Sequence, residues 1–593
     1  MTVTPPRAPG PGADTAAVPA ARPAERAVDG TGLTAVTRKF LAKATLITAS
    51  LSVAGALLGL VRDQALARLF GAGRETDAFL VAWTVPEFAA TLLIEDGLAI
   101  ALIPAFSLAL ARRAQGVPGD PVRSLVAGTL PRLSLGFVAV SALIIGGAPY
   151  LVEVLAPGLP DPGLAVDCTR LTATCVLSFG LAGYCSAALR AHRRFLPPAT
   201  IYVVYNAGII ATMFLLGGHW GVRSAAAGVA VGGCLMVAAQ LPSLWRQLTS
   251  HPVTPGGADV EVRPMNVALI STVLLFAMCR QSQVLIERFL ASTLPAGAIS
   301  HLNYAQKVAQ IPMTLSLMLC TVTFPVVAQA LADGDTERAR ARVERDMALA
   351  SFLVLLGAAT VIACAPQIIT ILFQRGAFTA QDTAVTSSVM RVYALGLLGQ
   401  TLVGILVRSY FSAGRATWYP IGAMAAGLVA TSWIGAGTVG LWGVSGIAAA
   451  NAAGITVTAA LLLAGLGQEP EGRARLKSAR ARTSEGPRRL ASAWALVRRG
   501  RAGRHSRPRG VPIRTRQVLS ELSRPVRAAA AATAAGAFAA SVPESPVAGL
   551  AVGCATVTVV FLLLGKALGA QGCTSALHSV RTITRRLRHG RSS

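Results

Sequence analysis

The feature that most constrains this chain is a series of apolar blocks, each about 18–25 residues long, that recurs along most of its length. A helix of that length crosses the hydrocarbon core of a bilayer. One such block is compatible with a secretion signal, but a repeated series is not. Only 14% of the residues are charged and 53% are hydrophobic, which is far from the composition of a soluble protein. The sequence therefore predicts an all-α polytopic membrane protein.

We predict about fourteen transmembrane helices. Their centres are expected near residues 52, 93, 138, 178, 207, 233, 275, 315, 356, 397, 426, 453, 534 and 557. A weak internal echo between Pro86–Pro104 and Pro312–Pro325 favours two six-helix lobes followed by two further helices. The expected parts are a disordered tail (1–35), an N-terminal lobe (36–250), a C-terminal lobe (251–466), a basic linker (467–524), a last helix pair (525–570) and a basic tail (571–593).

The net charge of +27 is concentrated outside the apolar blocks. In a soluble chain such a charge would suggest nucleic acid as the partner, but here it follows the rule that cytoplasmic loops are basic. We expect a multi-pass protein of the cell membrane with both termini in the cytoplasm. Anionic membrane lipids are the expected partners of the basic loops, and nucleic acid is not.

The sequence contains no residue pattern typical of an enzyme. Its histidines and cysteines are scattered without metal-ligand spacing, and the glycine-rich loop that binds ATP phosphates is absent. We therefore expect no catalytic residues, no metal and no cofactor. Active transport would depend on an ion gradient, the membrane potential or the gradient of the substrate itself.

Charged side chains within apolar segments are costly and usually face a cavity, so they are the candidate site residues. The candidates are Arg62, Asp77, Glu95, Asp96, Arg280, Glu287, Arg288 and Lys307. For several of them a plainer interpretation stays open. Arg62 and Asp77 also fit a solvated loop, Glu287 and Arg288 fit a local ion pair, and Lys307 fits a side chain that reaches the membrane surface.

Several motifs give the chain a family resemblance. The segment from Gly59 to Phe79 reads GLVRD, then LFGAG, then DAF, and it resembles the opening signature of the MurJ/MviN lipid II flippase family. Similar motifs follow in the family's order at residues 195–206, 289–312, 372–382 and 410–420. The resemblance covers about residues 35–465. It implies fourteen helices in two pseudo-symmetric lobes, within the multidrug/oligosaccharidyl-lipid/polysaccharide exporter superfamily, and alternating access of lipid II to the outer leaflet for peptidoglycan synthesis.

The chain departs from the family pattern at several basic positions. Members line the central cavity with arginines, whereas Ala56, Ala90 and Thr91 stand at three such positions and Lys307 replaces a fourth. Asp96 adds an acid beside Glu95. A cavity with fewer arginines would bind a pyrophosphate more weakly.

Three functions remain open from the sequence. The first is a flippase for lipid II or another polyprenyl-linked glycan precursor, and the second is a multidrug-type exporter. The third is a membrane scaffold whose basic linker recruits cell-wall synthesis proteins, a role that is compatible with transport.

Overall fold

The computed structural model describes residues 30–95, 97–115, 119–250, 267–321, 335–411, 417–466 and 513–570, with a few isolated positions between these ranges. Side chains are described from residue 47 onward. Asp96, the tail up to residue 29 and most of the basic linker lie outside the described residues. Every long element in the described part is a helix, which confirms the predicted all-α class.

The N-terminal half contains ten helical segments. They are α1 (Gly30–Phe70), α2 (Arg74–Ala82), α3 (Thr84–Ala89), the π-helical segment η1 (Ala90–Glu95), α4 (Gly97–Ala114), α5 (Pro121–Leu155), α6 (Pro162–Ala173), α7 (Cys175–Ala191), α8 (Leu196–Trp220) and α9 (Arg223–Thr249).

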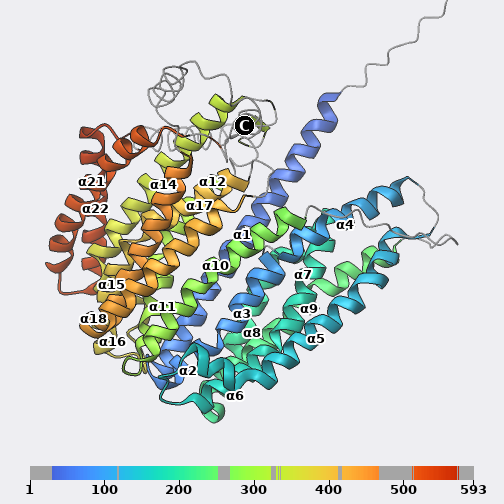
Figure 1. The fold of residues 1–593 in the computed structure, drawn as a ribbon, viewed down its shortest axis with the longest axis horizontal. Helices are drawn as coiled ribbons and strands as arrows, with labels where there is room; N and C mark the ends of the chain where they lie inside the picture. Colours follow the sequence, from blue (N-terminus) through green and yellow to red (C-terminus); the bar gives the residue numbers. More distant parts are fainter. Residues whose placement is uncertain are drawn as a thin grey trace, which may run out of the picture.

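The second half continues with eight described helices, and a final pair packs against its flank (Figure 1). The eight are α10 (Val267–Ser292), α11 (Ala298–Ala309), α12 (Ile311–Thr321), α14 (Thr336–Ala363), α15 (Ala365–Phe373), α16 (Ala380–Ala394), α17 (Leu397–Phe411) and α18 (Tyr419–Leu466). The final pair is α21 (Thr515–Ser541) and α22 (Pro546–Ala567). Residues 515–524, which the sequence assigns to the linker, are thus helical, because Val518 and Leu522 are buried there.

The predicted count of fourteen spans is not confirmed. Eight helical segments are long and apolar enough to cross a membrane, or up to nine if the bent pair α16–α17 is one span, counting only described residues. Described helices nevertheless lie at every predicted centre, and α18 contains two of them on either side of Gly443, where the backbone is not helical. The lower count arises partly because spans are interrupted, as between α11 and α12, which leaves pieces too short to cross alone.

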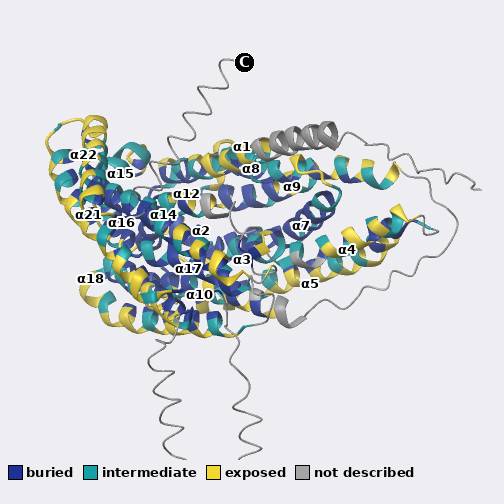
Figure 2. Ribbon diagram, turned by 90° about the horizontal axis from the view of Figure 1, so that it is seen from above, coloured by how far each residue is buried: buried dark blue, intermediate teal, exposed yellow. Residues whose placement is uncertain are grey.

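Buried residues gather in the interior of the helix bundle, while α5, α18 and α22 carry exposed apolar residues (Figure 2). Leu143, Trp433 and Leu563 are examples of such exposed side chains. An apolar outer surface is expected where lipid replaces water around a protein. The spans α2–α4 and α11–α12 are interrupted, and transporters commonly bind their cargo beside interrupted helices.

The α4–α5 connection is held by one buried carboxylate. Asp120 caps α5 by accepting from Val122 N–H at 3.1 Å, and it also receives Arg113 Nε at 3.0 Å. Burial alone would raise the pKa of Asp120, but Arg113 and the capping N–H groups outweigh burial and hold this pKa below its ordinary value. The ionised carboxylate is therefore stabilised by folding.

We expect Asp120→Ala to lower the free energy of unfolding by about 1 kcal/mol at neutral pH, because a helix cap is lost. A depressed pKa contributes stability above the unfolded value of about 3.9, and this stability disappears as the pH falls through the lower folded value. The difference between variant and parent should thus shrink below about pH 4. Thermal unfolding of both chains at several pH values measures this difference in stability. Asp161→Ala, at the exposed cap of α6, is the matched control and should cost less.

Candidate functional site

Two predicted cations from opposite halves meet around one carboxylate. In α1, Arg62 donates to the neighbouring Asp63 through Nη2 at 2.8 Å and Nε at 3.1 Å. From α11 in the other half, Lys307 Nζ lies 3.2 Å from the second oxygen of Asp63. Arg62 and Asp63 are buried, whereas the Lys307 side chain keeps 29% of its surface exposed. We call Arg62, Asp63 and Lys307 the central triad.

An aromatic ring and an amide hold the triad in place. The Arg62 guanidinium lies over the Trp83 ring at 4.3 Å from its centroid, and Lys307 Nζ lies 5.6 Å from the same centroid. Arg62 Nη1 also donates to Asn206 Oδ1 of α8 at 3.1 Å. Two cations and one carboxylate leave one formal positive charge in excess. The arrangement can therefore present donors to an anionic group.

A second polar cluster lies beside the first. Arg288 of α10 donates to Glu87 Oε2 at 2.9 Å and also to Thr84, the neighbour of Trp83. Gln281, two turns earlier in α10, donates to Thr91 Oγ1 at 2.7 Å. Because Thr84, Glu87 and Thr91 belong to the interrupted span α2–α4, these contacts also join the two halves. The positive charge of Arg288 is balanced here by Glu87.

The other candidates are dispersed. Glu287 is buried and accepts from Asn451 of α18, so it does not pair with its neighbour Arg288. Adjacent helical residues point about 100° apart, which accounts for the separate partners. Arg280 is exposed on α10, and Glu95 is exposed and receives the Tyr202 hydroxyl at 3.1 Å. Asp96 is outside the described residues.

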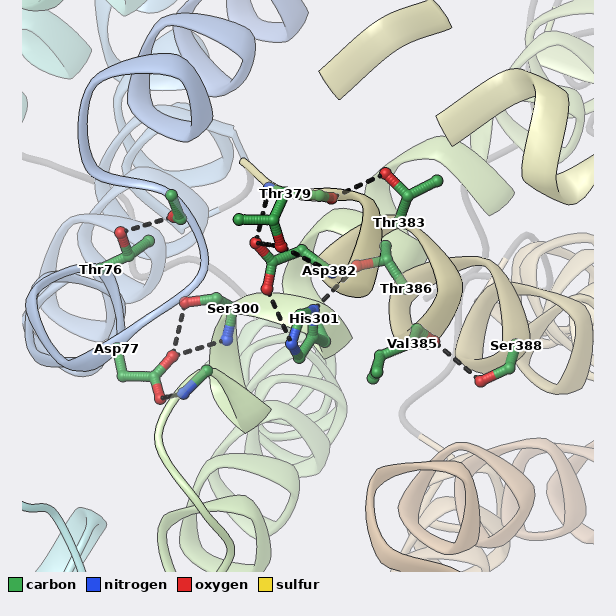
Figure 3. Close-up of polar contacts among 12 residues, drawn as sticks. Thr76, Asp77, Ser300, His301, Thr379, Asp382, Thr383, Val385, Thr386 and Ser388 are labelled. Carbon is green, nitrogen blue, oxygen red and sulfur yellow. Dashed lines mark hydrogen bonds and ion pairs between the residues drawn. The ribbon is translucent and has the colours of Figure 1, made fainter. Parts of the chain in front are cut away.

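Asp77 reaches across to the other half and caps a helix there (Figure 3). Its Oδ2 accepts from Gly297 N–H at 2.6 Å, and its Oδ1 accepts from Ser300 N–H at 2.8 Å and Ser300 Oγ at 2.5 Å. These N–H groups belong to the start of α11, where the helix dipole favours a negative charge. The next residue, His301, turns toward Thr386 of α16. Asp77 therefore fastens the helix that carries Lys307.

The backbones of the two halves also touch near the contact of Asp77 with α11. Ala377 N–H, in the α15–α16 turn, donates to Arg68 O of α1 at 2.9 Å. Gly376 has φ +66°, and a Cβ added there would lie 2.3 Å from Arg68 O. Gly71 has φ +67°, and its added Cβ would lie 2.7 Å from Ala377 O. We call these contacts, together with those of Asp77, the interlobe junction.

We expect Gly376→Ala to loosen the interlobe junction, because the added methyl group meets backbone and the left-handed conformation costs about 1 kcal/mol for alanine. Hydrogen–deuterium exchange of the Ala377 amide should accelerate about tenfold. Gly422→Ala is the control, since an added Cβ there meets nothing within 4 Å. Equal exchange in the two variants would contradict the expected role of close backbone approach.

Several polar residues at the site were not singled out from the sequence. Asp63 stands next to the candidate Arg62 and belongs to the GLVRD motif, but it is not among the predicted site residues. Trp83, Glu87 and Asn206 were not selected, although Glu87 is an acid directly after Pro86 in an apolar region. That position was the one available signal. The Asn206 amide looks like any small polar residue in a helix, and only its distant contact with Arg62 marks it.

Comparison with known proteins places the chain in a family. The family model described as "Lipid II flippase MurJ" matches residues 66–481, which is most of the chain. This chain belongs to the MurJ family. Among curated MurJ proteins, the lipid II flippase of Burkholderia cenocepacia is 28% identical over 383 residues, covering 63% of this chain and 73% of the relative. The probable lipid II flippase of Bdellovibrio bacteriovorus is 28% identical over 443 residues, covering 72% and 82%.

Solved structures agree with MurJ membership at the level of the fold. A lipid II flippase MurJ in an inward closed conformation superposes with a TM-score of 0.65 at 17% identity, covering 88% of this chain and 98% of that structure. An inward-facing multidrug resistance MATE transporter of the MOP superfamily gives a TM-score of 0.56 at 15% identity, covering 74% and 99%. The all-α fold predicted from the sequence is thus confirmed.

Proposed function

We propose that this chain translocates lipid II, the lipid-linked peptidoglycan precursor, from the inner to the outer leaflet by alternating access. The observation that carries the proposal is the central triad, in which cations of the two halves of a MurJ-family chain share Asp63. Arg62 and Lys307 are suited to bind phosphate oxygens once the pyrophosphate replaces the Asp63 carboxylate as their anionic partner. A site shared by two halves can close on one side and open on the other.

A cationic drug is a poorer match for this site. It would meet two cations and only one carboxylate, and Glu87 is already engaged by Arg288. Like charges at close range disfavour binding. The likeness to multidrug transporters therefore concerns architecture, and the charge of the triad favours an anionic cargo.

We also propose that the interlobe junction faces outward. Basic residues gather at the opposite end, where α4, α7, α9 and α22 end and α5, α8, α14 and α21 begin. They are Arg112, Arg113, Arg123, Arg190, Arg193, Arg194, Arg246, Arg338, Arg345, Arg514, Arg516 and Lys566. Because cytoplasmic ends are basic, the proposal assigns this end, and with it both termini, to the cytoplasm. A closed junction then corresponds to an inward-facing or occluded state.

Three further parts of the proposal concern energy and partners. We expect the ion gradient or the membrane potential to supply the energy, and collapse of that potential in intact cells should slow translocation. No metal or organic cofactor is required in this proposal. The basic linker, which lies outside the described residues at 467–510, is the segment proposed to contact cell-wall synthesis proteins. Its deletion should leave translocation in place but disturb recruitment of those proteins.

Complementation tests the proposed function. In cells depleted of their own lipid II flippase, we expect this chain to restore growth and cell shape. The matched control is the same chain at equal expression and membrane insertion with both triad cations replaced, R62A/K307A. Failure of the parent chain under these conditions would remove lipid II as the cargo and leave another polyprenyl-linked glycan as the alternative.

A further inference from the structure

A pocket of about 490 Å³ lies at the basic end of the N-terminal half, far from the central triad. It is formed by α1, the α7–α8 turn and the last turns of α9. Its lining includes Ile47, Arg193, Arg194, Phe195, Ser243 and Arg246. Ile47 precedes Arg62 by fifteen residues of the same helix, which corresponds to about 22 Å. The pocket is thus at the membrane surface when the triad is within the membrane.

Three arginines give the pocket a strong positive charge. Arg193, Arg194 and Arg246 are exposed, and among the residues that the structure describes none of them forms an ion pair. The positive end of the α8 dipole adds to this charge, because α8 begins at Leu196 without a side-chain cap. The pocket therefore offers guanidinium donors that no described acidic residue engages.

One of these arginines, Arg193, has an unfavourable backbone conformation. Arg193 has φ 57°, and it is the one non-glycine residue with positive φ in the described part of the chain. It follows the end of α7, where Arg194 N–H closes the turn on Leu189 O at 2.8 Å. Glycine is the usual residue at such a position, and another residue costs about 1 kcal/mol. This strained conformation turns attention to the Arg193 side chain, which lines the pocket.

Apolar side chains complete the rim of the pocket. Ile47 is 38% exposed, Phe195 is 39% exposed and Leu196 is 55% exposed. Trp245, next to Arg246, is 65% exposed, and tryptophan favours the boundary between head groups and acyl chains. Guanidinium groups beside exposed apolar surface match a molecule with an anionic head and an acyl tail.

We propose that this pocket binds the phosphodiester head group of an anionic phospholipid, with the acyl chains along Phe195 and Leu196. The pocket belongs to the N-terminal half alone, whereas a transported cargo must be held between the two halves. The inference therefore goes beyond the flippase function and concerns a resident lipid. Arginine binds phosphate oxygens through charge-assisted hydrogen bonds, which a zwitterionic lipid would oppose with its own cation.

Native mass spectrometry of the full-length chain tests the proposal. We expect dioleoyl phosphatidylglycerol to bind at least about tenfold more tightly than dioleoyl phosphatidylcholine, and R193Q/R194Q/R246Q to lose this preference. The control R338Q/R345Q/R516Q removes the same charge from exposed positions outside the pocket, and it should keep the preference. Equal preference in the two triple variants, whether kept or lost, would overturn the proposal.

Further measurements exclude other ligands and a folding defect. Arg193→Gly relieves the left-handed backbone, so it should unfold at an equal or higher temperature and still bind phosphatidylglycerol less tightly. Unchanged binding in this stable variant would count against the site. If millimolar inorganic phosphate displaced the lipid fully, the pocket would be a free-anion site. If R193Q/R194Q/R246Q weakened a polyprenyl pyrophosphate but not phosphatidylglycerol, the pocket would serve cargo entry, and the proposal would fall.

Discussion

Arg62→Ala is expected to reduce lipid II translocation by about a hundredfold. The substitution removes the guanidinium that contacts Asp63, Asn206 and Trp83, and it leaves Lys307 and Asp63 as a neutral pair. Charged hydrogen bonds contribute about 1.5–3 kcal/mol each, and a loss of about 3 kcal/mol corresponds to more than a hundredfold in affinity. Growth of flippase-depleted cells that carry the variant, at matched expression, measures the effect.

Two further variants separate charge from geometry. Arg62→Lys keeps the charge but loses the planar fork of donors, so intermediate growth is expected. Arg170→Ala removes an exposed arginine of α6 and should grow as the parent does. If Arg62→Ala grew as well as Arg170→Ala, the central triad would not be the cargo site.

Asp77→Ala is expected to open the interlobe junction. It deletes an acceptor of three hydrogen bonds from Gly297 and Ser300, and it leaves the start of α11 without its anion. A loss of about 3 kcal/mol would shift the equilibrium between closed and open junction by about a hundredfold. The variant should therefore favour the open junction and translocate poorly, because an alternating-access cycle needs both states.

Spin-label distances report this shift directly. Labels at the exposed residues Glu153 and Gln381, one in each half, should move apart in Asp77→Ala. A bio-orthogonal amino acid is the suitable attachment point, since the chain has nine native cysteines. Asp77→Asn keeps an acceptor oxygen without the charge, so its distance distribution should lie between those of the parent chain and Asp77→Ala. An unchanged distribution in Asp77→Ala would show that Asp77 does not hold the junction closed.

The helical architecture follows from the sequence because a span is a local pattern. About eighteen apolar residues predict a membrane helix whatever surrounds them. The interruptions at Thr174, Gln310 and Cys364 depend on how neighbouring helices pack, so the apolar pattern did not locate them. The apolar pattern thus locates a helix at each of the fourteen predicted centres. The count of full-length spans is lower because the pattern does not reveal where a span is interrupted.

Only the charged side chains within apolar segments could be predicted as site residues. Arg62 and Lys307 stand out because a charge in an apolar segment needs a reason. The contact of Lys307 with Asp63 joins residues 244 positions apart in sequence, and no local sequence pattern predicts it. Arg288 was selected, but its partner Glu87, 201 positions away, was not. Asp77 is a predicted cavity residue, and its contact with the start of α11 is a long-range feature that the sequence does not reveal.

The most direct test of the central claim measures lipid II in the outer leaflet. Cells depleted of their own flippase and carrying this chain are exposed to an added enzyme that cleaves lipid II and cannot cross the membrane. We expect the parent chain to make newly synthesised lipid II susceptible to cleavage, and R62A/K307A to leave it protected. Lipid II that stayed protected with the parent chain, or became equally susceptible with R62A/K307A, would contradict translocation through the central triad.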